Sequence, residues 1–241
     1  MTQDWYDAYY SHIDAHGDLE GWNAAIAQVV RELRAREVQP ARIVDLGCGR
    51  GALLRTLVHE GLFERHEVYG VEQSVVATQE LARAGCHIVH TDLQCRLPFS
   101  EDMFSYVIVA EVIEHLLRPI SFLREIVRIL VPGGYLILSF PNYINAPWLA
   151  LRLTAEWFNK PEMIILQPTD RILFYPQLKG MVISQGLHFV SARGTFYFPP
   201  LPRGATLEPR WFTQLADHLG LQSLSFHPVL VFQKPALSTS R

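Results

Sequence analysis

The stretch from Ile43 to Gly51 combines residue types that could hold a small ligand. An apolar run leads into Asp45, and glycines then occupy every second position, 47, 49 and 51. Glycine has no Cβ atom, so such a turn can adopt positive φ angles and bring its backbone close to a ligand. Amides at the start of the following helix favour a carboxylate or a phosphate. We therefore interpret Asp45, Gly47 and Gly49 as ligand-binding residues; the alternative is a turn that only joins a strand to a helix.

Two further acids follow apolar runs downstream of this turn. Glu72, with Gln73 beside it, follows the next apolar run, and an acid about 20 residues beyond a glycine turn can accept both hydroxyls of a ribose. Asp92 and Leu93 follow the run after that. Each acid has a structural alternative, since Glu72 could end a strand in solvent and aspartate commonly caps turns. The order of these residues along the chain supports one shared site.

Glu111, Glu114 and His115 are the candidate catalytic residues. They stand at positions i, i+3 and i+4, so a helix would place all three on one face. His115 would accept a proton most readily near neutral pH, with the glutamates orienting it. Carboxylates and an imidazole also suit a divalent metal, although we predict no metal ligands. A third option is structural, with Glu111 closing the ligand pocket and His115 packing below the helix.

Alternating strand and helix patterns position these residues. Seven apolar segments read as strands, at residues 42–46, 68–71, 87–90, 104–110, 135–140, 187–195 and 229–233. Amphipathic or apolar segments read as helices, at residues 21–36, 52–59, 74–84, 119–130, 176–185 and 208–219. Such alternation predicts an α/β fold, a doubly wound and mostly parallel sheet with helices on both faces. Ligands bind at the carboxyl ends of the strands in such sheets, where the acids stand.

Composition narrows the class of protein. The 241 residues suit one α/β domain with additions, and 49% hydrophobic residues can bury a large core. The net charge of −3 does not favour nucleic acid as a partner. Three unevenly spaced cysteines form no disulfide framework, which fits a reducing compartment. We see neither a secretory signal nor a stretch as long as a membrane span, and we predict a cytoplasmic protein.

The order D-x-G-x-G-x-G differs from the G-x-G-x-x-G of dinucleotide folds. With acids after the next strands, it resembles the class I S-adenosylmethionine-dependent methyltransferases over about residues 38–140. The resemblance implies a Rossmann-like fold and S-adenosyl-L-methionine as cofactor. It implies that Asp45, Gly47 and Gly49 hold the methionine end and that Glu72 holds the ribose. It further assigns Gln73 and Glu111 to cofactor binding and Asp92 with Leu93 to the adenine, which completes the predicted site.

The segment around Glu111 resembles ubiquinone-biosynthesis O-methyltransferases and small-RNA 2′-O-methyltransferases. The RNA enzymes carry a further histidine where this chain has Asp170. That departure and the absence of a basic stripe favour methyl transfer to a small or lipid-like acceptor at oxygen. Such transfer is an in-line displacement at the sulfonium carbon, so the protein mainly aligns the reactants. A general base is needed only where the acceptor must lose a proton.

A regulatory role is the alternative function. The run at residues 138–142 resembles methionine-biosynthesis proteins of this fold, some of which act through a partner enzyme. The chain would then bind S-adenosylmethionine and a partner protein without transferring a methyl group. A nicotinamide enzyme is a weaker option because of the turn spacing.

Two regions lie outside this core pattern. Residues 1–36 contain an aromatic segment and a helix, which we interpret as an N-terminal lid and helix; a surface arm is the alternative. Residues 37–241 form the cofactor-binding domain, with an insertion at about 141–175 that we expect to cover the substrate. Its apolar helix, at residues 145–158, and the apolar loop at 196–202 would wall a hydrophobic pocket. Packing on the core, a homodimer contact and a membrane-surface patch stay open for these aromatic residues.

Overall fold

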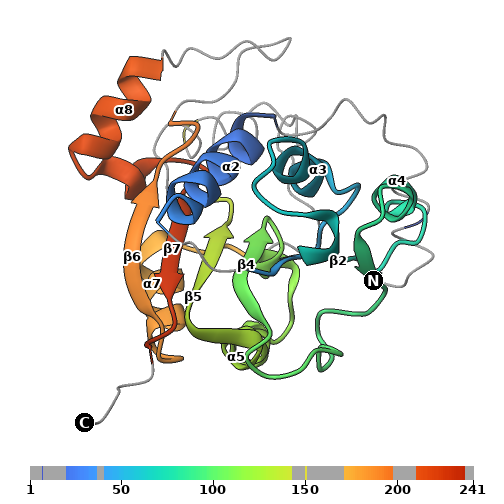
Figure 1. The fold of residues 1–241 in the computed structure, drawn as a ribbon. Helices are drawn as coiled ribbons and strands as arrows, with labels where there is room; N and C mark the ends of the chain where they lie inside the picture. Colours follow the sequence, from blue (N-terminus) through green and yellow to red (C-terminus); the bar gives the residue numbers. More distant parts are fainter. Residues whose placement is uncertain are drawn as a thin grey trace, which may run out of the picture.

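The computed structural model describes residues 7, 20–36, 41–142, 150, 171–197 and 210–236. The helices in this part of the chain (Figure 1) are α2 (Glu20–Arg34), α3 (Ala52–His59), α4 (Gln79–Arg83), α5 (Pro119–Ile129), α7 (Tyr175–Ile183) and α8 (Arg210–His218). Short 3-10 helices are η2 (Arg65–Glu67), η3 (Ile113–His115) and η5 (Leu221–Leu224). The strands are β1 (Ile43–Leu46), β2 (Val68–Val71), β3 (His87–Val89), β4 (Phe104–Ala110), β5 (Leu130–Ser139), β6 (His188–Arg193) and β7 (Val229–Gln233).

The strands form one seven-stranded sheet in the order β3-β2-β1-β4-β5-β7-β6. Strands β1 to β5 pair in parallel, and β7 runs antiparallel to both β5 and β6. The chain winds outward from β1 to β3 and then returns to add β4 on the other side of β1. The sequence prediction of a doubly wound, mostly parallel seven-stranded sheet is confirmed. Its switch point lies between β1 and β4, which is where open sheets of this kind form their ligand crevice.

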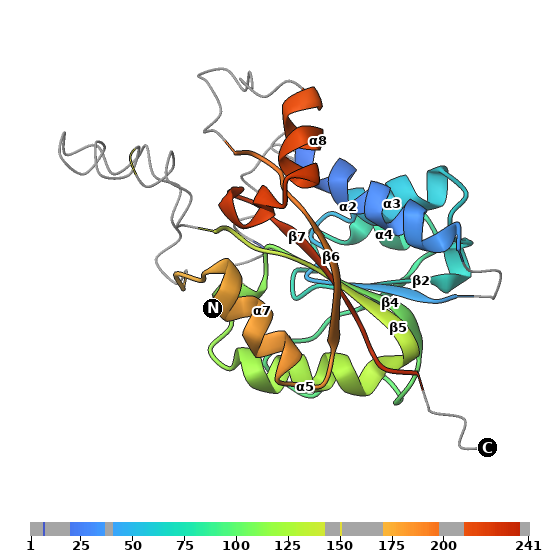
Figure 2. The same ribbon diagram turned by 90° about the vertical axis from the view of Figure 1, so that its left-hand side faces the viewer.

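Helices cover both faces of the sheet. Figure 2 shows α2, α3 and α4 on one face and α5 and α7 on the other. Strand side chains alternate between faces: Ile43 packs in the core under α2 and α3, whereas Val44 packs in the core under α5 and α7. Asp45 therefore shares the face of Ile43, at the end of a fully buried strand.

Several predicted boundaries shift. The helix predicted at residues 74–84 is confined to α4, because the Ser74 hydroxyl accepts the Ala77 amide at 3.1 Å and holds a turn ahead of the helix. Strand β5 begins at Leu130, directly after α5, although we predicted this strand only from residue 135. A β-bulge between Phe104 and Tyr106 lets β4 pair with this early segment. The predicted helix at residues 145–158 and most of the insertion lie outside the described residues.

Candidate functional site

The glycine turn after β1 has no room for a side chain at Gly47. Gly47, Gly49 and Gly51 have φ angles of 91°, 50° and 71°, a left-handed region that disfavours other residues. A Cβ atom at Gly47 would lie 2.4 Å from Cγ2 of Val112. The amides of Gly47 and Cys48 donate to the Val71 carbonyl at 2.7 and 3.0 Å. The turn is thus tied to the end of β2 and lies against the segment that follows β4.

The carboxylate of Glu72 joins this turn to the loop after β2. Its Oε2 accepts the Gly49 amide at 3.1 Å, and its Oε1 accepts the amides of Gln73 and Ser74 at 2.8 and 3.1 Å. Burial raises the pKa of Glu72, and the three amides oppose that rise. A carboxylate offers about four acceptor positions, so one remains on Oε2. Glu72 can accept one hydroxyl as it stands, and a second would have to displace the Gly49 amide.

Asp45 is buried next to Glu72 without comparable support. Its side chain is 4% exposed, and Oδ1 has no hydrogen-bond partner among the described residues. Burial and then the charge of Glu72 raise the pKa of Asp45 to about 7. A buried polar atom without a partner is costly, so this carboxyl is suited to a ligand that brings a donor or a positive charge.

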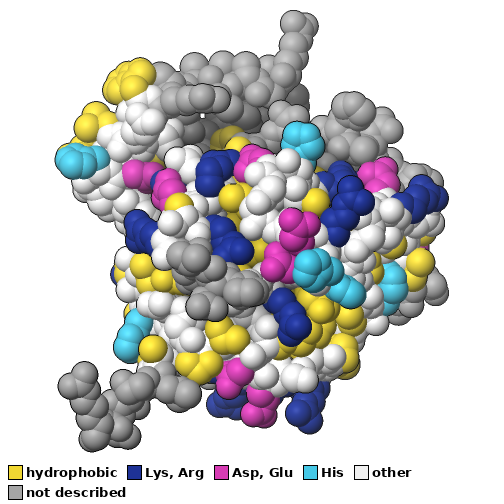
Figure 3. All heavy atoms as spheres, in the orientation of Figure 1, with side chains coloured by type: hydrophobic (Ala, Val, Ile, Leu, Met, Phe, Trp, Pro, Cys, Tyr) yellow, Lys and Arg dark blue, Asp and Glu magenta, His cyan; other side chains and the backbone are white. Residues whose placement is uncertain are grey.

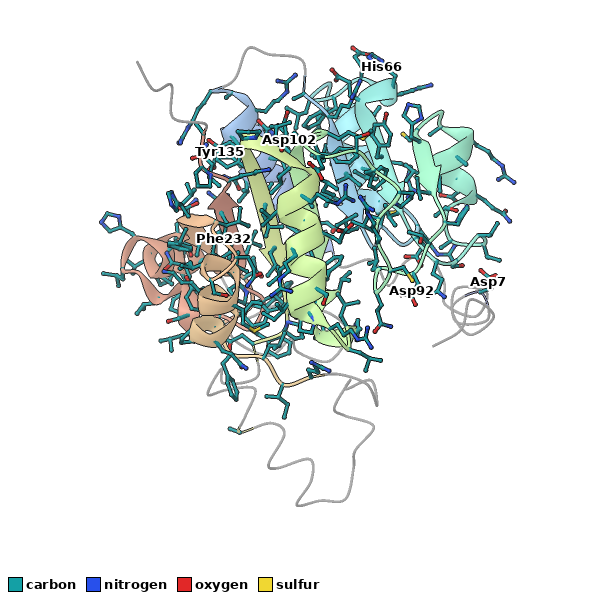
Figure 4. All side chains as sticks on the ribbon, turned by 90° about the horizontal axis from the view of Figure 1, so that it is seen from below. Asp7, His66, Asp92, Asp102, Tyr135 and Phe232 are labelled. Atoms are coloured by element: carbon teal, nitrogen blue, oxygen red, sulfur yellow. The ribbon has the colours of Figure 1, made fainter. Side chains whose placement is uncertain are left out.

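Asp92 and Leu93 follow β3, the next strand outward. Oδ1 of Asp92 accepts the Gln94 amide at 2.9 Å, so the turn-capping role that we weighed for this residue is present. Figure 4 shows Asp92 on the α4 side of the molecule and Phe232 of β7 on the other side. The predicted cofactor residues after β1, β2 and β3 therefore lie along neighbouring strand ends.

Glu111, Glu114 and His115 do not share a helical face, which corrects that expectation. Glu111 has φ 54°, and its amide donates to the Ser139 carbonyl at 3.2 Å, which continues the pairing of β4 with β5. Only residues 113–115 form a helix, the 3-10 helix η3. Glu114 is buried, and its Oε1 lies 3.8 Å from Nε2 of His115. Glu114 and His115 thus form a pair of their own, whose catalytic role stays a prediction.

Glu111 contacts a residue that the sequence did not indicate. Its Oε1 accepts the Ser139 hydroxyl at 2.8 Å, and its Oε2 lies 2.9 Å from Nδ1 of His227. His227 precedes β7, and Val229 of β7 pairs with Ser139. No local pattern marks His227, because its contact with Glu111 depends on β7 lying antiparallel beside β5.

Asn142, just after β5, fastens the segment that carries His227. Its amide donates to the Phe226 carbonyl at 2.6 Å, and its Nδ2 donates to the carbonyls of Ser223 and Ser225 at 2.8 and 3.0 Å. On the other side the His227 amide donates to the Thr195 carbonyl at 3.1 Å. The backbone around His227 is therefore held from two directions.

Asp7 is the described residue of the N-terminal aromatic segment. Its Oδ1 accepts hydrogen bonds from the Ser74 hydroxyl and, at 3.3 Å, from the Val76 amide. The contact with Ser74 lowers the pKa of Asp7. This residue of the predicted lid therefore touches the loop that carries Glu72. The rest of the segment before α2 lies outside the described residues, so the choice between lid and arm stays a prediction.

The described residues also bear on the metal, membrane, nucleic-acid and disulfide questions raised by the sequence. Within the described ranges no three His, Cys, Asp or Glu side chains gather as metal ligands would. No helix in the described part of the chain is long and apolar enough to cross a membrane. The face in Figure 3 carries acidic and basic side chains side by side. Cys48, Cys86 and Cys95 are free thiols.

The switch-point sheet, the glycine turn and the acids at successive strand ends define a class I S-adenosylmethionine-dependent methyltransferase domain. Residues 44–138 match the family model described as "Methyltransferase domain", so the chain contains a domain of this family. S-adenosyl-L-methionine is the cofactor of this class. The resemblance seen in the sequence is thereby confirmed.

Relatives and fold neighbours agree with that assignment. Trans-aconitate 2-methyltransferase of Pseudomonas aeruginosa is 32% identical over 149 residues, which cover 57% of this chain and 54% of the relative. Ubiquinone biosynthesis O-methyltransferase of Serratia proteamaculans is 25% identical over 129 residues, which cover 53% and 54%. The chain thus spans about half the length of these relatives. The methyltransferase component of a complex with the Haloferax volcanii Trm112 activator has the same fold, with a TM-score of 0.66, 20% identity and coverage of 95% and 97%.

Replacing Gly47 by Ala will destabilise the protein more than the same change at Gly186. Gly186 has a similar φ of 88° but nothing within 4 Å of an added Cβ atom. Left-handed backbone costs about 1–2 kcal/mol at either site, and the overlap with Val112 adds roughly 1–3 kcal/mol at Gly47. Urea unfolding of both variants measures the difference. Equal losses would show that Val112 does not restrict the turn.

Replacing Asn142 by Ala will loosen the segment before β7. One buried and one part-buried carbonyl lose their donor, and the expected loss of unfolding free energy is about 1–3 kcal/mol. Ser223→Ala is the matched control, because it retains the carbonyl that Asn142 contacts and removes only an exposed hydroxyl. Chemical unfolding of both variants is the measurement. A loss as large in Ser223→Ala as in Asn142→Ala would contradict the role of Asn142.

Proposed function

We propose that the protein transfers the methyl group of S-adenosylmethionine to an oxygen atom of a small or lipid-like acceptor. The observation that carries the proposal is the pair of buried carboxyls, Asp45 and Glu72, beside a turn with no room for a side chain at Gly47. One carboxyl is held by backbone amides, and the other has an oxygen without a partner among the described residues. This combination suits a ligand with both hydroxyls and a positive charge.

The residues would divide the cofactor among them. Asp45 would bind the ammonium group of the methionine end, and Gly47 and Gly49 would admit that end against the backbone. Glu72 would bind the ribose through its remaining acceptor position, with Gln73 beside it. Asp92 has one oxygen in its own turn, so its other oxygen, together with Leu93, would contact the adenine. When bound, the cofactor supplies the activated methyl group.

Glu111 would close the cofactor pocket toward the acceptor. It follows β4 directly, and Val112 next to it packs against Gly47. The contact of Val112 with Gly47 and the pairing of Glu111 with His227 support this role. The names of two relatives, one of them an O-methyltransferase, support a small-molecule acceptor and, with the acid–imidazole pair, transfer to oxygen.

The cofactor assignment predicts a specific loss of affinity in Glu72→Ala. Isothermal titration with S-adenosylhomocysteine should give one site, and the variant should bind at least about tenfold more weakly, since one charged hydrogen bond contributes about 1.5–3 kcal/mol. Glu101→Ala removes an exposed acid in the loop before β4 and should bind like the natural protein. Unchanged affinity in Glu72→Ala would refute the ribose assignment, and no binding at high micromolar concentration would refute the proposed function.

The alternative function, regulation of a partner protein, needs the same cofactor site but gives no methylated product. Incubation with S-adenosylmethionine labelled with tritium in its methyl group separates the two functions. Label in small molecules of a protein-free cell extract supports the enzyme. Binding of S-adenosylhomocysteine with no labelled product, and stable co-purification of a second protein, would support the regulator.

Asp45→Asn should stabilise the cofactor-free protein and weaken cofactor binding. The folded-state pKa of Asp45 is about 7, above the unfolded value of about 3.9. The unfolded chain therefore loses this proton first as pH rises, and the natural protein loses at most about 4 kcal/mol between pH 4 and pH 8. The amide of Asn does not titrate. The stability advantage of Asp45→Asn over the natural protein should therefore grow from pH 5 to pH 7 and then level off.

Unfolding free energies at several pH values test this, with Glu101→Gln as the control for an exposed carboxyl. Titration calorimetry with S-adenosylmethionine gives the second readout, because Asn cannot match the charge of an ammonium group. A constant difference in stability across this pH range would show that Asp45 is ionised throughout.

A further inference from the structure

The Glu111–His227 pair lies at the ligand-binding edge of the sheet. Because β7 is antiparallel, its first residues meet the carboxyl ends of the parallel strands, and Val229 pairs with Ser139 at the end of β5. Val112, the neighbour of Glu111, packs against Gly47. The segment that carries Glu111 therefore borders the glycine turn, and His227 joins it there from a distant part of the sequence.

The pair places an imidazole within ion-pair distance of an acid. The side chains of His227 and Glu111 are 9% and 15% exposed, and Nδ1 lies 2.9 Å from Oε2. Ser139 donates to the other carboxylate oxygen at 2.8 Å, which fixes the carboxylate. A carboxylate at Nδ1 favours the proton on that nitrogen and leaves the lone pair of the imidazole on Nε2. A positioned base of this kind is the arrangement that proton abstraction requires.

The pair lies on the opposite half of the edge from Asp45, Glu72 and Asp92. Asp45, Glu72 and Asp92 follow β1, β2 and β3, on one side of the switch point. Glu111 follows β4 and His227 precedes β7, on the other side. Around the imidazole, the rings of Phe226 and Phe196 lie edge-on at 4.4 and 5.8 Å. These rings form apolar walls that suit an aromatic or lipid-like acceptor.

The need for a base separates two classes of oxygen acceptor. A carboxylic acid, with a pKa of about 4, is already ionised at neutral pH, whereas a phenol, with a pKa of about 10, is not. A carboxylate acceptor could attack the methyl group directly, and a base would add nothing to the reaction. A hydroxyl must lose its proton during or before the attack. Among oxygen acceptors, a buried acid–imidazole pair is therefore useful only for a hydroxyl.

We propose that His227 accepts the proton of a phenolic or alcoholic hydroxyl acceptor and that Glu111 positions its imidazole; this rests on the proposed function. The acceptor oxygen forms a bond to the methyl carbon while the bond from sulfur to that carbon breaks. The hydroxyl proton moves to Nε2 of His227, and Glu111 stabilises the imidazolium. The products are the methyl ether, S-adenosylhomocysteine and the protonated imidazole, which returns its proton to solvent.

Methyl transfer to two probes tests the acceptor class. Catechol offers only hydroxyls, and trans-aconitate offers only carboxylates. We expect labelled methyl in catechol, and a kcat lowered by about 10²–10³ in His227→Gln with the affinity for S-adenosylhomocysteine within twofold of the natural value. His218→Gln, an exposed histidine on α8, is the matched control, and His115→Gln tests the competing base. Transfer to trans-aconitate alone, or full activity of His227→Gln on catechol, would overturn the proposal.

The protonation state of His227 tests the pair without any acceptor. In protein labelled with ¹⁵N-histidine, the signal lost in His227→Gln identifies the residue, with or without S-adenosylhomocysteine. In the neutral ring we expect the proton on Nδ1, and loss of this preference in Glu111→Gln but not in Glu111→Asp. A neutral ring protonated at Nε2 would overturn the proposal even if neither probe is methylated. Failure to bind S-adenosylhomocysteine would instead count against the cofactor site.

Discussion

The hydrogen bonds from three backbone amides to the Glu72 carboxylate hold the cofactor edge of this protein in place. One amide comes from the glycine turn after β1, and two come from the loop after β2. A buried charge is costly unless it is hydrogen-bonded. The three amides therefore stabilise the Glu72 carboxylate, and the carboxylate in turn holds their two loops together. Asp45 lies close enough to feel the charge of Glu72, and its Oδ1 has no hydrogen-bond partner among the described residues. Glu72 is therefore hydrogen-bonded by the protein itself, whereas Asp45 is suited to a ligand.

The topology of the sheet then separates the edge into two halves. Strands β1 to β3 wind away from the switch point in one direction, and β4 and β5 add in the other. Because β7 returns antiparallel beside β5, its start contributes a histidine to the acceptor half. Hydrogen bonds from Asn142 hold that segment. One half of the edge, which would bind the methyl donor, thus consists of acids and glycines. The acceptor half consists of an acid, an imidazole and aromatic rings.

Prediction from the sequence succeeded where the signal is local. The strands β2, β4 and β7 and the helix α3 have the predicted bounds, because buried apolar runs and an amphipathic pattern can be read within a short window. The helix before β3 is shorter than predicted, since Ser74 uses its hydroxyl to hold a turn, a choice that its sequence neighbours do not specify. The spacing of Glu111, Glu114 and His115 suggested one helical face, but pairing of Glu111 with β5 takes precedence over helix formation.

The sequence by itself determined the class of the domain, the glycine turn and the acids at successive strand ends. These features are local, since each acid follows the apolar run that places it. Only the tertiary structure decided which side chains meet: Glu72 with the Gly49 amide, and Glu111 with Ser139 and His227. Such contacts join strands that are distant in the chain, and they exist because sheet order and an antiparallel last strand bring those strand ends together. The spacing of residues along the chain does not predict the order of the strands in the sheet.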